Sequence, residues 1–179
     1  SHRLGVWVNA GNGTLDGGGS YELGAASVPQ AIVAGDFDDD GRIELAIALA
    51  GTNAVQIMLP SDPGFFGFGG SYPVGAIPRS LAIGDFDGDG HLDLVTANQD
   101  VDGVSVLLGV GDNTFGGTVG FDAGDAPRAV VVGDWNGDGA ADLATANESA
   151  DAIAILLGAG DGSFASPTVI ALGAGSAPA

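Results

Sequence analysis

Three acidic loops carry the clearest chemical signal in the sequence. Each places an acid or an amide at positions 1, 3 and 5, a glycine at position 6 and an acid at position 9. Oxygen donors at this spacing can converge on one point when the backbone curls, and hard cations such as Ca²⁺ prefer oxygen ligands. The odd positions from 1 to 9 are Asp36, Asp38, Asp40, Arg42 and Glu44 in the first loop, Asp85, Asp87, Asp89, His91 and Asp93 in the second, and Asp134, Asn136, Asp138, Ala140 and Asp142 in the third.

The spacing predicts one Ca²⁺ in each loop, three in all. Positions 1, 3, 5 and 9 offer side-chain oxygens, position 7 offers its backbone carbonyl, and the glycine at position 6 allows the sharp turn. An EF-hand needs a bidentate Glu at position 12, where this chain has Ile47, Thr96 or Thr145. The remaining alternative is three Asp-rich turns that hold no ion. We expect the third site to be the weakest, because Asn136 replaces an aspartate there.

The composition limits the partners of the chain. Its 179 residues contain 23 acids, only three of them Glu, against four Arg and no Lys, which gives a formal charge of −19. Nucleic acids and anionic membrane surfaces bind basic proteins, so neither is an expected partner. Hydrophobic residues make up 45% of the chain, which excludes a disordered acidic tail. Cysteine is absent, so the chain has no disulfides and no thiolate metal sites.

The acidic loops belong to a repeat that covers almost the whole chain. Equivalent positions recur at a step of 49 residues, as in Pro29, Pro78 and Pro127. Within one repeat, two almost continuously apolar strands flank the acidic loop, and two further strands follow between turns rich in Gly, Asp and Asn. In the second repeat we expect these strands at residues 80–84, 92–97, 103–108 and 118–123.

This pattern predicts an all-β fold built of β-propeller blades, each with four antiparallel strands. β-Sandwich modules of about 100 residues and calcium β-rolls with a repeat of about nine residues do not fit the step. We expect residues 1–29 to form the last two strands of a partial blade, and residues 30–78, 79–127 and 128–179 to form three blades with one calcium loop each. About three and a half blades do not close a ring, so we expect further blades on a longer chain or self-association.

The second loop also resembles a known family. The segment Gly84-Asp85-Phe86-Asp87-Gly88-Asp89-Gly90-His91-Leu92-Asp93-Leu94, with the strand after it, is similar to the FG-GAP/VCBS repeats of integrin α-subunit propellers and of many microbial extracellular proteins. The resemblance implies a seven- or eight-bladed propeller, an extracellular or cell-surface location and structural Ca²⁺ on one rim. It implies no single activity, because such propellers serve adhesion, sugar binding and enzymes alike. Asn136, Glu44 and the additional Asp39 depart from the pattern of the family.

Several residues outside the ligand positions have simpler expected roles. Phe37, Phe86 and Trp135 share position 2 of the three loops, and we expect them to fill the core between blades. Arg79 and Arg128 follow the prolines that open two of the blades. We expect each arginine to form an ion pair with an acidic neighbour.

The leading functional hypothesis is a non-enzymatic, extracellular, calcium-stabilised propeller segment for adhesion, recognition or assembly, with a protein or glycan ligand. The apolar Phe65 and Phe68 interrupt the repeat, which indicates either local packing or contact with a partner. A second hypothesis is a lectin-like propeller in which Trp7, Tyr21 or Tyr72 stacks on sugar. A third is the non-catalytic part of a secreted polysaccharide-acting enzyme, since the chain itself lacks a supported catalytic pair. No stretch supplies the roughly 20 apolar residues of a membrane span.

Overall fold

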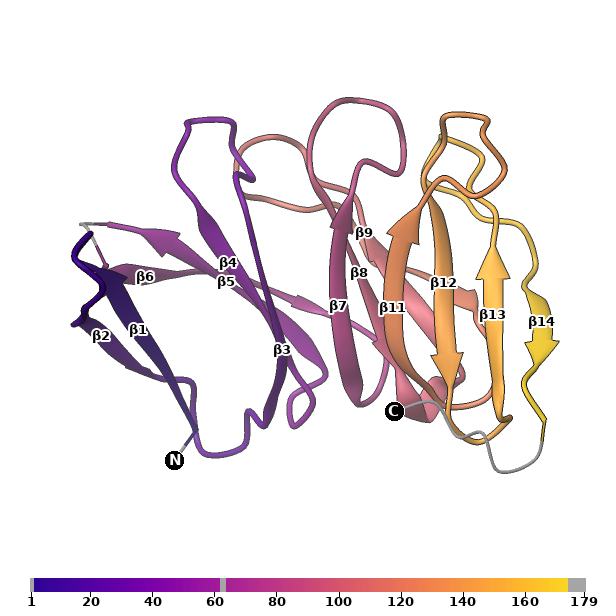
Figure 1. The fold of residues 1–179 in the computed structure, drawn as a ribbon, viewed down its shortest axis with the longest axis horizontal. Coiled ribbons are helices and arrows are strands. Elements are labelled where there is room, and N and C mark those ends of the chain that lie inside the picture. The colour runs from indigo at the N-terminus through magenta and orange to yellow at the C-terminus, as the bar shows by residue number, and fades with distance from the viewer. Residues whose placement is uncertain (1, 62–63, 174–179) are drawn as a thin grey trace.

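The computed structural model describes residues 2–61 and 64–173, and its strands form four antiparallel sheets placed side by side (Figure 1). The first sheet has two strands, and each of the next three has four strands that pair in chain order. The predicted all-β propeller-blade fold is therefore confirmed. The strands are β1 (Arg3–Asn9), β2 (Leu15–Glu22), β3 (Pro29–Gly35), β4 (Glu44–Leu49), β5 (Ala54–Pro60), β6 (Phe66–Pro73), β7 (Pro78–Gly84), β8 (Asp93–Asn98), β9 (Gly103–Leu107), β10 (Val119–Asp122), β11 (Pro127–Gly133), β12 (Asp142–Asn147), β13 (Ala152–Leu156) and β14 (Thr168–Ala171).

We call β1–β2 the partial blade, and β3–β6, β7–β10 and β11–β14 blades 1, 2 and 3. The strands of blade 2 lie within two residues of the expected positions. The single helical element among the described residues is one turn of 3₁₀ helix, η1 (Gln99–Val101), which is far too short to cross a bilayer. Each blade is built from one continuous stretch of sequence, so no described strand joins the sheet of another blade.

The core lies between the blades. In blade 2 every residue of β8 and β9 is buried, because blades 1 and 3 cover its two faces. In blade 3 the equivalent strand β13 alternates between buried and half-buried residues, since one face has no described neighbour. Continuous apolar runs thus form where a strand is covered on both sides.

Strained backbone recurs where one blade leads into the next. Val28, Ile77 and Ala126 each precede the proline that opens a blade, and their φ angles of 45°, 53° and 52° lie in the left-handed region. This region is unfavourable for β-branched residues such as valine and isoleucine. Each corner is held by hydrogen bonds, as where the Ile77 amide donates to Asn53 Oδ1 at 3.0 Å and the Ile77 carbonyl accepts from Gln99. The strain is therefore fixed by the surrounding structure in all three blades.

The expected roles of two side chains, Trp135 and Arg79, are wrong. Phe37 and Phe86 fill the core between blades, with 3% and 1% of their surface exposed, but Trp135 is 47% exposed because no described blade packs against it. Arg128 pairs with Glu148 at 3.0 Å, as expected. Arg79 instead donates to the amide oxygens of Gln99 and Gln30, because these are the acceptors that the two adjacent blades place beside it.

The aromatic residues considered for partner or sugar contact divide into two groups. Tyr21 packs edge-on against Phe66, and its hydroxyl accepts a hydrogen bond from the Phe66 amide at 2.7 Å. Tyr72 packs in the same way against Phe115. Trp7, Phe65 and Phe68 remain exposed, so they alone among these residues present apolar rings to solvent.

Candidate cation sites

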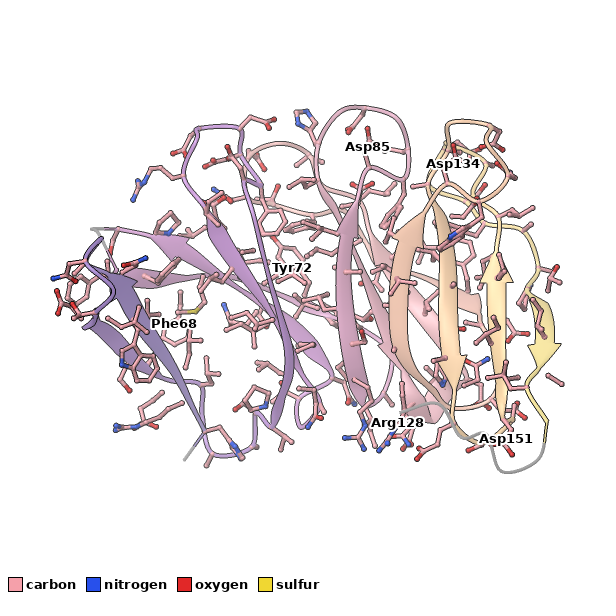
Figure 2. All side chains as sticks on the ribbon, viewed as in Figure 1. Phe68, Tyr72, Asp85, Arg128, Asp134 and Asp151 are labelled. Carbon is pink, nitrogen blue, oxygen red and sulfur yellow. The ribbon has the colours of Figure 1, made fainter. Side chains whose placement is uncertain are left out.

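The three acidic loops lie at one edge of the blades. They join β3 to β4, β7 to β8 and β11 to β12, so each follows the first strand of its blade. Asp85 and Asp134 stand at this edge, whereas Arg128 and Asp151 lie at the opposite edge (Figure 2). The common edge follows from the repeat, because equivalent loops of parallel-stacked blades must point the same way.

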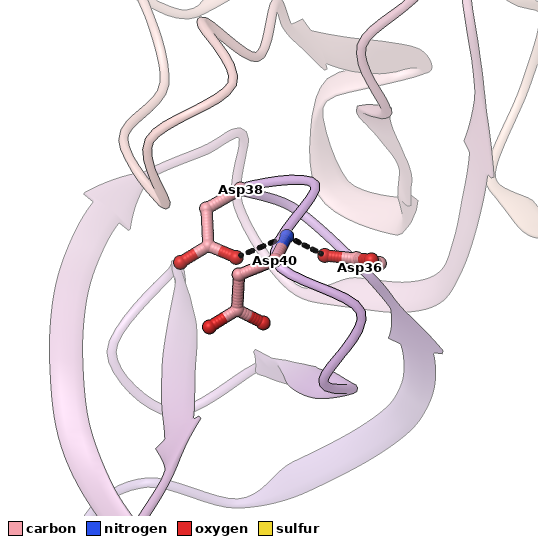
Figure 3. Close-up of side chains that lie close together, drawn as sticks. All are labelled: Asp36, Asp38 and Asp40. Atoms are coloured by element: carbon pink, nitrogen blue, oxygen red, sulfur yellow. Dashed lines mark hydrogen bonds between the residues drawn. The ribbon is translucent and has the colours of Figure 1, made fainter.

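The first loop brings its three aspartates together. Carboxylate oxygens of Asp36, Asp38 and Asp40 all lie within 4.8 Å of one another. The Asp40 amide donates to Asp36 at 3.1 Å and to Asp38 at 3.3 Å (Figure 3). The Gly41 amide donates to the second Asp36 oxygen at 2.8 Å, and Gly41 has a φ of 84°, which a glycine adopts without strain. Backbone amides therefore orient these carboxylates within the curled loop.

The second loop gathers a different trio. Oxygens of Asp85, Asp87 and Asp93 lie within 4.8 Å of one another. Asp89 lies outside this trio, and Glu44, which matches Asp93 in the repeat, lies outside the trio of the first loop. The structure thus brings three of the four predicted carboxylates together in each of these loops.

The third loop has the same backbone design with fewer charges. Asp134 accepts hydrogen bonds from Gly137 at 2.7 Å and from Gly139 at 3.0 Å, as Asp85 does from Gly88 and Gly90 in the second loop. Asn136 donates its side-chain amide to Asp138 at 2.7 Å. One oxygen of Asp138 is therefore already engaged by a neutral neighbour.

The acid at position 9 also has a structural role that the sequence did not indicate. Asp93 is fully buried, and its two oxygens accept hydrogen bonds from the amides of Phe86 at 2.6 Å and Gly109 at 2.7 Å. Asp142 holds Trp135 and Gly158 in the same way. The carboxylate thus ties the acidic loop to the end of the third strand of its blade.

Burial perturbs two of these position-9 acids. Loss of solvent raises the pKa of Asp93 to about 6, although the bonds from Phe86 and Gly109 act in the opposite direction. Burial likewise raises the pKa of Glu44, and the charges of Asp38, Asp36 and Asp40 add to the effect. A nearby cation would favour the ionised form of both groups.

Basic side chains do not neutralise the loops. Arg42 is the one arginine within them, and its guanidinium donates to the carbonyls of Pro60 and Ser61 at 2.5 and 3.1 Å. Among the described residues, the ion pairs are Arg3–Glu22, Arg128–Glu148 and His91–Asp39. Within residues 2–61 and 64–173, Asp39 is therefore the one loop acid that forms an ion pair.

Two side chains of blade 2 reach the first loop. His91 Nδ1 lies 2.9 Å from Asp39 Oδ2. Asn113, in the turn after β9, donates its side-chain amide to Asp38 Oδ2 and its backbone amide to the Phe37 carbonyl. Sequence reasoning missed Asn113, although the repeat step gave a signal, because glycine stands at the equivalent positions 64 and 162.

The pKa of His91 provides a test of this contact between blades. The hydrogen bond with Asp39 raises the pKa of His91, and the charges of Asp89 and Asp85 add to it. Protonated His91 therefore stabilises the folded protein below the ordinary pKa of about 6.5, and this contribution disappears as the pH rises through the folded-state pKa. In calcium-free buffer, NMR titration should give a pKa above 6.5 that falls in Asp39→Gly. Glycine suits the φ of 58° at position 39, so an unchanged pKa in this variant would show that the pair does not form in solution.

The donor set of the loops fits a hard divalent cation. It consists of carboxylate and amide oxygens without sulfur ligands, and the loops hold uncompensated negative charge. Ca²⁺ bound here would neutralise this charge and cross-link the positions of each loop. The buried position-9 acid, the loop glycines and the backbone amides would hold the carboxylates in place for it.

Comparisons with known proteins agree with this architecture. The profile of the FG-GAP-like repeat matches residues 1–47 and 85–145. Crystal structures of two candidate 6-phosphogluconolactonases are similar to the chain. The protein from Bacteroides fragilis gives a TM-score of 0.66 at 19% identity, over 92% of this chain and 46% of that chain. The protein from Bacteroides uniformis gives 0.67 at 17% identity, over 93% of this chain and 52% of that chain.

These likenesses bear on the fold alone, because both identities are low. The chain spans about half the length of either protein. No curated protein matches the sequence.

Proposed function

Because the chain belongs to the FG-GAP-like repeat family, we propose that it is a calcium-stabilised segment of an extracellular β-propeller that serves adhesion, recognition or assembly and performs no catalysis itself. One observation carries the proposal: of the twelve acids in the three loops, only Asp39 has a basic partner among the described residues. Such clustered like charges favour binding of a cation. Extracellular Ca²⁺ is abundant enough for sites with dissociation constants of about 10⁻⁴–10⁻³ M.

Calorimetric titration of the metal-free protein with Ca²⁺ tests this proposal directly. We expect three bound ions and dissociation constants in the range of extracellular modules. A titration that shows no Ca²⁺ binding at 10 mM Ca²⁺ would refute the proposal. Mg²⁺ should bind more weakly, because it demands a stricter octahedral geometry and loses its water reluctantly.

The three sites should differ in affinity. The third loop has three carboxylates, of which Asp138 also accepts a hydrogen bond from Asn136. We expect this site to release its ion first as Ca²⁺ is removed. Asn136→Asp should tighten it about tenfold, because ligand charge tunes calcium affinity. Site-resolved NMR titration of the Gly139 amide measures the change.

Asn12→Asp is a matched control for this variant. It adds the same charge in the exposed turn between β1 and β2, outside the three acidic loops. An equal gain in affinity from Asn12→Asp would show that the overall charge matters rather than the ligand set. A third site that is already the tightest in the unmodified protein would also contradict the prediction.

Self-association is the second component of the proposal. Blade 3 exposes Val131 and Trp135, at 56% and 47%, and an apolar depression lies between Ala129 and Ile153 on the same blade. Exposed apolar patches of this kind favour association. We expect concentration-dependent oligomers at micromolar protein in sedimentation experiments, and Val131→Glu should weaken them.

Val101→Glu is the control for surface charge in general. Val101 is 53% exposed but lies in the 3₁₀ turn of blade 2. A monomeric protein at all concentrations, or equal effects of the two substitutions, would mean that the face of blade 3 does not mediate association.

Glycan binding is the second candidate function, and one observation favours it. Trp7 is 65% exposed beside a depression lined by the Gly17–Gly19 run of β2. Flat aromatic rings in this setting suit stacking on sugar. A glycan array distinguishes the two functions, because Trp7→Ala should abolish any signal that depends on this ring.

A further inference from the structure

The contact between Asn113 and the first acidic loop is incompletely satisfied. The Asn113 amide donates to Asp38 Oδ2, while Asn113 Oδ1 is buried and has no hydrogen-bond partner among the described residues. A buried oxygen without a partner is costly, which makes its position informative. It lies beside a carboxylate that belongs to the Asp36, Asp38 and Asp40 cluster.

The only other such side-chain atom among the described residues has a different setting. Asn147 Oδ1 lies at the far end of β12, away from the acidic loops. In blade 2 the equivalent Asn98 Oδ1 accepts a hydrogen bond from the Thr96 hydroxyl, whereas in blade 3 the corresponding Thr145 hydroxyl donates to the Ala123 carbonyl. The unpaired oxygen of Asn147 thus follows from the different bond that Thr145 makes in its own blade.

The repeat itself supplies the comparison for Asn113. At the junction of blades 2 and 3, the equivalent Gly162 donates its backbone amide to the Phe86 carbonyl at 2.9 Å, as Asn113 does to Phe37 at 3.3 Å. Gly162 has no side chain to reach Asp87, which is the counterpart of Asp38. The backbone bond is therefore common to both junctions, and the side-chain contact occurs at one.

A second side-chain contact reinforces the first junction. His91 meets Asp39 there, whereas the equivalent residues at the next junction are Ala140 and Gly88. Both contacts come from blade 2 and reach the loop of blade 1. The loop of blade 1 is thus held by its neighbour in a way that the loop of blade 2 is not.

We propose that Asn113 is a positioning residue of the first cation site, supplied by the neighbouring blade. Its amide nitrogen orients the Asp38 carboxylate, so that one predicted ligand of the cation is held by a side chain of the next blade, although the contact leaves Asn113 Oδ1 buried without a partner among the described residues. The inference rests on the proposed calcium binding and deepens it. Ca²⁺ binding in blade 1 and docking of blade 2 are coupled through this side chain, because each orders a group that the other needs.

Asn113→Gly is the appropriate variant. Asn113 has a φ of 65°, which glycine adopts freely, so the substitution reproduces the other junction without straining the turn. The amides of Gly41, Gly90 and Gly139 each donate to the first aspartate of their loop, at 2.8, 3.1 and 3.0 Å. Their NMR shifts during Ca²⁺ titration report the three sites separately. We expect Asn113→Gly to weaken the Gly41 site about tenfold, as loss of an outer-shell partner commonly does, and to leave the other two within about twofold.

Asn53→Gly is the matched control. Asn53 has a similar φ of 52° and also bonds to a neighbouring segment through its side chain, but it lies between β4 and β5 at the opposite edge. The Gly41 isotherm should be unchanged in this variant. An unchanged isotherm in Asn113→Gly, or equal weakening of all three sites, would overturn the inference. Absence of any Ca²⁺-induced shift in the unmodified protein would instead refute the proposed function.

Discussion

Calcium at 10 mM is expected to raise the free energy of unfolding by about 1.4–2.7 kcal/mol for each occupied site, if the dissociation constants lie at about 10⁻⁴–10⁻³ M. Three sites together would contribute roughly 4–8 kcal/mol, which corresponds to a rise in melting temperature of roughly 10–30 °C for a chain of this size. The physical reason is mass action, because the unfolded chain does not hold the loop carboxylates together. Thermal melts followed by circular dichroism, with and without chelator, measure the effect.

Ionic screening must be separated from specific binding. The chain carries a charge of −19, so any salt reduces its self-repulsion. Sodium chloride of equal ionic strength is therefore the control, and it should give only a small part of the shift. A melting temperature that responds equally to both salts would exclude specific calcium sites.

Asp93→Ala is expected to lower the free energy of unfolding by about 2–5 kcal/mol, even without calcium, because it leaves two buried backbone amides without acceptors. These are the amides of Phe86 and Gly109, which the two oxygens of Asp93 hold in the folded protein. Part of the loss is offset, since the substitution also removes a carboxylate whose pKa is raised to about 6 by burial. Urea unfolding at pH 7 in chelator measures the difference.

Asp89→Ala provides the contrast within the same loop. Asp89 is exposed, and its side chain accepts a hydrogen bond from the backbone amide of His91 at 2.8 Å, at the surface of the loop. Asp89→Ala should change the free energy of unfolding in chelator by less than about 1 kcal/mol. The same substitution should reduce the increase in this free energy that calcium produces. Equal losses for the two variants in chelator would mean that the buried carboxylate does not hold the loop.

The repeat pattern was sufficient to predict the blades, because strand period and turn composition are local properties. The second blade shows this, since residues 80–84 were expected to form a strand and Pro78–Gly84 does. The backbone of the corners was not predictable. Nothing in the local sequence indicates that Ile77, a β-branched residue before proline, adopts a φ of 53°.

The ligand positions were likewise predicted from the spacing of the acids in each loop. The contacts that hold these ligands in place depend on tertiary structure. Asp93 was predicted as a ligand, whereas its bond to Gly109 depends on how the third strand ends beside the loop. Asn113 is remote from Asp38 in sequence and reaches it only because blades 1 and 2 pack together. Trp135 was wrongly placed in the core because its equivalents are covered by a following blade and it is not.

The continuous chain segment of each blade has a consequence for cooperativity. Every described ladder of strand hydrogen bonds begins and ends within one blade. Backbone hydrogen bonds from a turn to the acidic loop of the preceding blade are made by the amides of Asn113 and Gly162 among the described residues. A blade at the end of the array can therefore open without breaking the ladder of its neighbour. Each blade is then stabilised by its own strand pairing and by its contacts with the adjacent blades, so the molecule behaves as a short one-dimensional array of folding units.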